Sequence, residues 1–203
     1  PLVAYNGALI GQWQEGEFRV LQDIPILEAD VAALIGLIEQ SFPAVSIGLY
    51  AGKDWHVAKM NQWVELEASI TGETPLVTDF EAFLAQKPVV HKFLLIGEEA
   101  DIAQLLVFLQ EQDFPETSFY LSKANYLEIT HRSVSKGHAL SLLADMHGLS
   151  MEVTLAFGDH FNDLSMLEAA GVGVAMGNAP QVVQEAADEV TADNHHNGVS
   201  LYL

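Results

Sequence analysis

The sequence GDHFND, at Gly158–Asp163, decides the fold of this 203-residue chain. It follows an apolar run, residues 153–157, that reads as a buried strand. It precedes residues 164–170, which read as a short helix closed by Gly171. Two carboxylates and a carboxamide therefore lie where a strand ends and a helix begins. Open α/β sheets bind their ligands at this edge, so the motif predicts an α/β fold with a site at the strand tip.

The side chains of this motif suit a magnesium ion and a phosphate. Magnesium binds a few carboxylates and keeps its other positions for water and phosphate, and the start of a helix attracts an anion. Asp159, at the strand tip, is the expected metal ligand. An Asn or Asp that only caps a helix would produce the same local pattern, and the six residues alone leave both readings open.

Segments on either side of the motif favour the first reading. Upstream are LEIT at Leu127–Thr130 and SVSKGHAL at Ser133–Leu140; downstream are GVGVAMGNA at Gly171–Ala179, AADEVT at Ala186–Thr191 and NGV at Asn197–Val199. With this order and spacing, the chain resembles the C-terminal half of the haloacid dehalogenase superfamily, in its Cof-type sugar-phosphatase-like branch. The opening VAYNGA, at Val3–Ala8, resembles the strand that leads from the core of those proteins into their cap.

The resemblance implies an α/β architecture with two parts. One is a Rossmann-like core, which we expect at residues 1–16 and 122–203. The other is an inserted α/β cap, expected at residues 17–121, which in such proteins covers the active site and selects the leaving group. Asn6 and Asp159 are then expected at the same end of one sheet.

The resemblance also implies a function and roles for particular residues. The function is magnesium-dependent hydrolysis of a small phosphate ester, such as a sugar phosphate, through an aspartyl phosphate. Asp159 and Asp163 would ligate the metal, and Asp163 would also orient Lys136 or the water around the metal. Asn162 would donate a hydrogen bond to phosphate. Lys136, the last basic residue of the chain, would neutralise phosphate charge.

One expected element is missing from the sequence. Phosphatases of the superfamily carry their nucleophile in a DxDGT motif, and no Asp-x-Asp occurs in these 203 residues. We therefore expect this chain by itself to be inactive and its core sheet to lack strands. It would be a fragment of a longer protein, although completion by another chain and a non-catalytic form stay open. The alternative function is a phosphate-ligand-binding or regulatory module on a degenerate form of this fold.

Composition limits the partners. The formal charge is −20 with only eight Lys plus Arg, too few basic groups for nucleic acid or an anionic membrane surface. There is no cysteine for a disulfide or a thiolate metal site. No run reaches transmembrane length, and we expect a cytoplasmic protein with a small-molecule substrate.

Periodicity and turn residues predict the remaining elements. Helices are expected at residues 25–40, 61–71, 98–112, 136–147 and 179–187, and strands at residues 2–10, 18–21, 45–50, 55–57, 89–96, 118–121, 126–129, 172–176 and 190–191.

Overall fold

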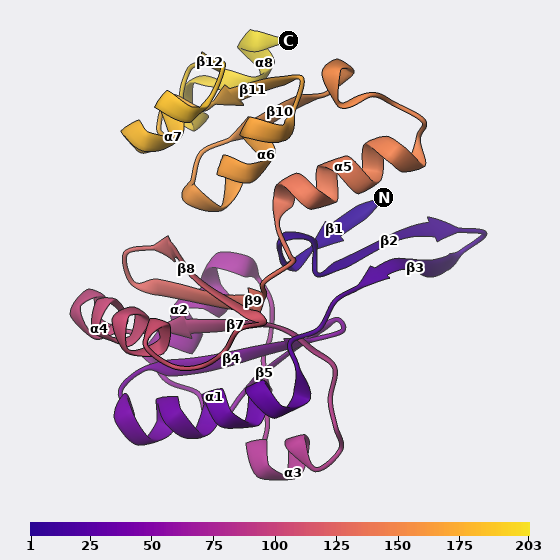
Figure 1. Ribbon diagram of the computed structural model, residues 1–203. Coiled ribbons are helices and arrows are strands. Elements are labelled where there is room, and N and C mark those ends of the chain that lie inside the picture. The colour runs from indigo at the N-terminus through magenta and orange to yellow at the C-terminus, as the bar shows by residue number, and fades with distance from the viewer. The chain divides into compact units, whose positions relative to one another are not determined.

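The computed structural model describes residues 1–203 and divides them into two compact units (Figure 1). Unit 1 comprises residues 1–22 and 134–203, and unit 2 comprises residues 23–133. The expected boundaries, after residue 16 and before residue 122, both lie elsewhere. The first moves because β3 (Glu17–Asp23) joins the three-stranded sheet of β1 (Leu2–Ala4) and β2 (Leu9–Gln14). The second moves because β8 (Thr117–Lys123) and β9 (Tyr126–His131) belong to the sheet of unit 2.

Unit 2 is built on a six-stranded sheet with the order β6-β5-β4-β7-β9-β8. Its other strands are β4 (Ser46–Ala51), β5 (Asp54–Val57), β6 (Leu76–Val77) and β7 (Val90–Ile96). All neighbours pair antiparallel except β5 and β6. The strands predicted at residues 45–50 and 55–57 are β4 and β5, and they form a hairpin in which Ala51 and Asp54 are paired at the end.

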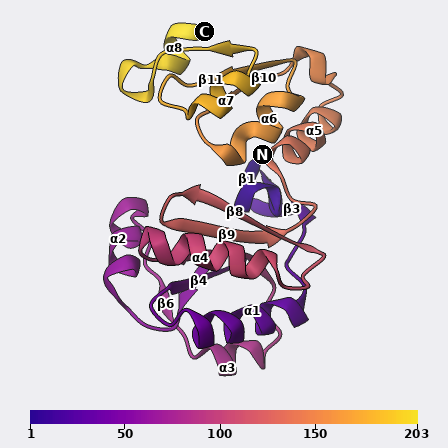
Figure 2. The ribbon, with the colours of Figure 1, turned by 60° about the vertical axis from the view of Figure 1, so that its left-hand side comes forward.

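Helices cover both faces of this sheet (Figure 2). The main core joins one face to α1 (Glu28–Ser41), α3 (Phe80–Leu84) and α4 (Glu99–Gln110). Apolar side chains of α1 recur at helical spacing, which places them on the buried side. They are Val31, Leu34, Ile35 and Ile38. On the opposite face, α2 (Gln62–Thr71) packs through Val64 against β5.

Unit 1 contains two separate three-stranded sheets. One holds β1, β2 and β3; the other is parallel and holds β10 (Leu155–Gly158), β11 (Val172–Ala175) and β12 (Glu189–Val190). The helices are α5 (Lys136–Met146), α6 (Leu164–Ala169), α7 (Gln181–Ala186) and α8 (Gly198–Tyr202), with 3-10 turns at residues 5–7, 151–153, 161–163 and 194–196. None of the helices in the chain combines the length and apolarity needed to cross a lipid bilayer.

The first segment differs from the single strand expected at residues 2–10. A turn at Tyr5–Gly7 breaks it, and all three residues have positive φ, at 52°, 57° and 109°. The chain reverses there, so β1 pairs antiparallel with β2. Because β10 pairs only with β11, Asn6 and Asp159 follow strands of different sheets. The expectation that one sheet holds both is wrong.

Candidate active site

Three of the four predicted site residues, Lys136, Asp159 and Asp163, line one pocket of unit 1, with a volume of about 680 Å³; Asn162 does not line it. Its polar wall carries Asn6, Lys136, Asp159, Asp163 and Asn194. The rest of its lining is largely apolar and comes from β1, α5, α6, β10, α8 and Met176, which follows β11. Residues more than 150 positions apart in sequence therefore share this pocket.

The GDHFND motif forms a compact turn in which Asp163 points back toward the strand. One oxygen of its carboxylate, Oδ2, accepts hydrogen bonds from the backbone N–H groups of Asp159, at 2.9 Å, and His160, at 3.1 Å. A Cβ on Gly158 would lie 2.5 Å from the Cβ of Asp163. Glycine is therefore required at the strand end, because any side chain there would displace the Asp163 carboxylate.

Lys136 and Asp163 form a short ion pair. The Lys136 Nζ donates to Asp163 Oδ1 at 2.5 Å, and the side chains are 30% and 7% exposed. Lys136 is the first residue of α5, whose N-cap is Ser135. The helix dipole disfavours a cation at this end, so the Asp163 carboxylate offsets an unfavourable placement. A lysine at a helix N-terminus is an unfavourable local choice, and such choices are typical of functional sites.

Asp159 is exposed at the mouth of the pocket and is held by one neighbour. Its Oδ2 accepts a hydrogen bond from Asn178 Nδ2 at 2.9 Å, and Asn178 Oδ1 accepts one from the backbone N–H of Asn194 at 3.0 Å. Sequence reasoning missed Asn178, because it predicted a strand at residues 172–176 and assigned no role to the residues that follow. The signal was a carboxamide three residues after β11, the strand that pairs with β10, which Asp159 follows.

Asn162 lies beside the N-terminal segment. Its Nδ2 donates to Asn6 Oδ1 at 3.3 Å, across 156 positions of sequence. Asn6 lines the pocket and Asn162 does not, so Asn162 is connected to the pocket through Asn6.

The donor set fits a magnesium ion held by few protein ligands. Asp159 accepts one hydrogen bond within the chain, at Oδ2, and its Oδ1 is free to bind a cation. Asp163 has both oxygens engaged by Lys136 and two backbone N–H groups. No group of three or more acidic or imidazole side chains forms a closed cation site. The carboxylate oxygen that Asp159 leaves free is compatible with magnesium, which uses one or two carboxylates and retains water and phosphate.

Comparison with known proteins identifies the family. The model of the haloacid dehalogenase-like hydrolases matches residues 1–203, so the chain belongs to this family. A protein of Haemophilus influenzae is 37% identical over 203 residues, which is 100% of this chain and 74% of that protein. The resemblance stated from the sequence is confirmed.

Solved structures agree with the fold. A haloacid dehalogenase-like hydrolase from Bacteroides thetaiotaomicron superposes with a TM-score of 0.83 at 28% identity, covering 98% of this chain and 73% of that one. A subclass IIB sugar phosphatase of the superfamily superposes with a TM-score of 0.78 at 25% identity, covering 97% of this chain and 72% of that one. The predicted α/β fold of the superfamily is thereby confirmed.

Proposed function

We propose that this chain supplies the magnesium- and phosphate-binding residues of a phosphomonoesterase acting on small phosphate esters, sugar phosphates among them. The observation that carries the proposal is the convergence of Lys136, Asp159 and Asp163 in one pocket, with the Lys136 ammonium held by Asp163. The similarity to a sugar phosphatase supports this class of substrate.

Each side chain has a distinct role in this proposal. The Lys136 ammonium, 30% exposed, neutralises phosphate oxygens as negative charge develops on them. Asp163 is a positioning residue: it orients Lys136 and holds the backbone of Asp159 and His160. The second N–H of the Asn162 amide donates to a phosphate oxygen, while the first bonds Asn6.

Metal ligation falls to Asp159, with Asn178 as its positioning residue. Asp163 stays a predicted second ligand of the metal; because its carboxylate already accepts three hydrogen bonds, we propose that it also positions Lys136. Magnesium, when bound at Asp159, would offset the repulsion between a chain of charge −20 and an anionic substrate.

These residues do not include a nucleophile. No Asp-x-Asp occurs in the sequence, the Asp163 carboxylate already accepts three hydrogen bonds, and a carboxylate that binds a metal is a poor in-line nucleophile. We propose that the attacking carboxylate lies outside these 203 residues, and that the chain alone binds phosphate without hydrolysing an ester.

Hydrolysis of p-nitrophenyl phosphate tests this proposal. With magnesium, the purified 203-residue chain should not exceed a no-enzyme control. A version with a DxDGT-containing segment supplied before Pro1 should be active, and Asp159→Ala in that version should abolish turnover by removing the metal ligand.

Two results would contradict the proposal. One is magnesium-dependent turnover by the 203-residue chain that survives repurification and is lost in Asp159→Ala. The other is an extended protein that binds inorganic phosphate but hydrolyses nothing, which would favour the non-catalytic ligand-binding module.

A further inference from the structure

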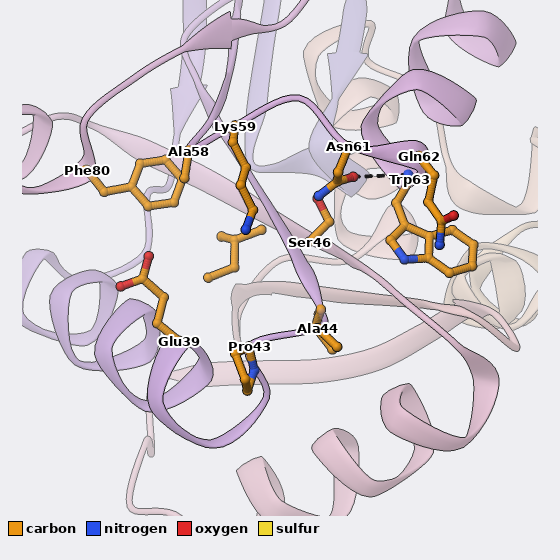
Figure 3. A pocket seen from close by; sticks show the side chains of 12 residues that line it. Glu39, Pro43, Ala44, Ser46, Ala58, Lys59, Asn61, Gln62, Trp63 and Phe80 are labelled. Atoms are coloured by element: carbon orange, nitrogen blue, oxygen red, sulfur yellow. Dashed lines mark hydrogen bonds between the residues drawn. The ribbon is translucent and has the colours of Figure 1, made fainter.

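Unit 2 contains a second pocket, and no residue of the proposed active site lines it (Figure 3). It has a volume of about 630 Å³, within the range of about 300–1,000 Å³ found for small-molecule sites. It lies where β4 begins, β5 ends and the helices α2 and α3 start. All its lining residues belong to unit 2, so the pocket is complete within that unit.

Two side chains of opposite charge line this pocket and form no ion pair with each other. Glu39 projects from the last turn of α1, and Lys59 follows β5. Figure 3 shows the Lys59 ammonium and the Glu39 carboxylate both directed into the hollow. Neither forms an ion pair within the chain, although Lys87 and Glu28 in the same unit do so at 3.2 Å. One molecule with both an anionic and a cationic group could satisfy both side chains.

Fixed polar groups extend the Lys59 side of the pocket. Asn61 Oδ1 accepts from the backbone N–H groups of Trp63 and Val64, each at 3.0 Å, so the orientation of its amide is set. Asn61 Nδ2 donates to Ser46 Oγ at 3.3 Å. This leaves the Ser46 hydroxyl proton and one amide proton of Asn61 available to a ligand. Together with the ammonium, these donors suit a carboxylate.

The walls of the pocket are apolar. Trp63 is half-buried on one side, and Phe80, 7% exposed, lies on the other (Figure 3). Val45 and Ile47, each 7% exposed, also line it. Aromatic walls around a few charged groups favour a ligand with an apolar body and a polar end.

We propose that this pocket binds a small zwitterion of the α-amino-acid class with an apolar or aromatic side chain. Its carboxylate contacts Lys59, Ser46 and Asn61, its ammonium contacts Glu39, and its side chain lies between Trp63 and Phe80. The site goes beyond the proposed phosphatase function and does not depend on it, because the two pockets share no residue.

Titration with L-phenylalanine, followed by NMR of the tryptophan indole N–H signals, tests the proposal. The Trp63 signal should move with saturation, while Trp13, in unit 1, serves as an internal reference. Phenethylamine, which lacks the carboxylate, and 3-phenylpropionate, which lacks the ammonium, should each bind at least about tenfold more weakly, because each loses a charge-assisted contact.

Charge-neutralising variants test whether Lys59 and Glu39 contact the ligand. Lys59→Gln and Glu39→Gln should each weaken binding of L-phenylalanine about tenfold or more. The matched controls Lys53→Gln and Glu65→Gln remove exposed charges of the same unit outside the pocket and should leave affinity unchanged. Because all four positions are exposed, the variants should keep the fold, which the buried Trp55 signal reports.

Three outcomes would overturn the proposal. The first is that none of the twenty amino acids moves the Trp63 signal. The second is binding that both pocket variants leave intact. The third is 3-phenylpropionate or phenethylamine binding as tightly as L-phenylalanine, which would exclude a zwitterion as the ligand class.

Discussion

Tyr126→Phe tests the contact that fixes α2 on the sheet of unit 2. The Tyr126 hydroxyl donates to Glu67 Oε2 at 2.9 Å, and these residues are 4% and 7% exposed. This is the only hydrogen bond that the Glu67 carboxylate makes within the chain. The first residues of α2 line the pocket of unit 2, so the contact also supports that site.

The expected loss in the free energy of unfolding follows from the buried carboxylate that Tyr126→Phe leaves without a donor. Phenylalanine fills almost the same volume, so little packing is lost, but the Glu67 carboxylate stays buried without a donor. Such an unsatisfied group costs about 1–3 kcal/mol of the free energy of unfolding. Replacing both partners by apolar residues, in Glu67→Met with Tyr126→Phe, should cost less than the single change, since apolar replacements of buried polar pairs are often near neutral.

The raised pKa of Tyr126 predicts that the stability of the chain depends on pH in the alkaline range. Burial, and then the hydrogen bond to Glu67, raise the pKa of Tyr126 above its ordinary value of 10.0. Below pH 10 the Tyr126 hydroxyl keeps its proton in both the folded and the unfolded chain, so the hydrogen bond to Glu67 contributes fully to stability. Above pH 10 the hydroxyl ionises in the unfolded chain but not yet in the folded chain, so stability falls as the pH rises toward the folded pKa. Tyr126→Phe should remove this part of the alkaline decline.

Urea unfolding followed by tryptophan fluorescence measures both effects, because Trp55 and Trp63 lie in unit 2. Tyr120→Phe is the matched control: its hydroxyl donates to Glu128 at 3.4 Å, and Glu128 keeps Lys92 as a partner. A Tyr126→Phe protein within about 0.5 kcal/mol of the parent at pH 7, with an unchanged decline above pH 10, would refute the reasoning.

Two further predictions concern unit 1. Asp163→Asn should lower its free energy of unfolding by about 2–4 kcal/mol, because Lys136 loses a buried counterion; a double-mutant cycle with Lys136→Met that shows no coupling would contradict this. Gly137→Ala should weaken binding of inorganic phosphate, since a Cβ there would lie 2.2 Å from the Ser165 carbonyl oxygen and shift the start of α5. Isothermal titration would detect the loss. Gly36→Ala, on an exposed helix face with open space around it, should instead stabilise unit 2 by about 0.5–1 kcal/mol.

Local sequence determined most elements and the centre of the candidate site. Helix α2 was predicted at residues 61–71 and found at Gln62–Thr71, with Asn61 as its cap, because capping needs only neighbours in sequence. The GDHFND turn was predictable for the same reason: Asp163 reaches the backbone of residues three and four positions earlier.

Tertiary structure decided what depends on distant partners. The pairing of β9 with β7, and of β8 with β9, moved the boundary between the units, and strand propensity does not specify which strand is the neighbour. The commitment of Asp163 to Lys136, 27 positions away, and of Asp159 to Asn178, 19 positions away, depends on how helices and strands pack. The pocket of unit 2 could not be predicted from the sequence, because Glu39 and Lys59 are 20 positions apart and only the folded chain places both in one pocket.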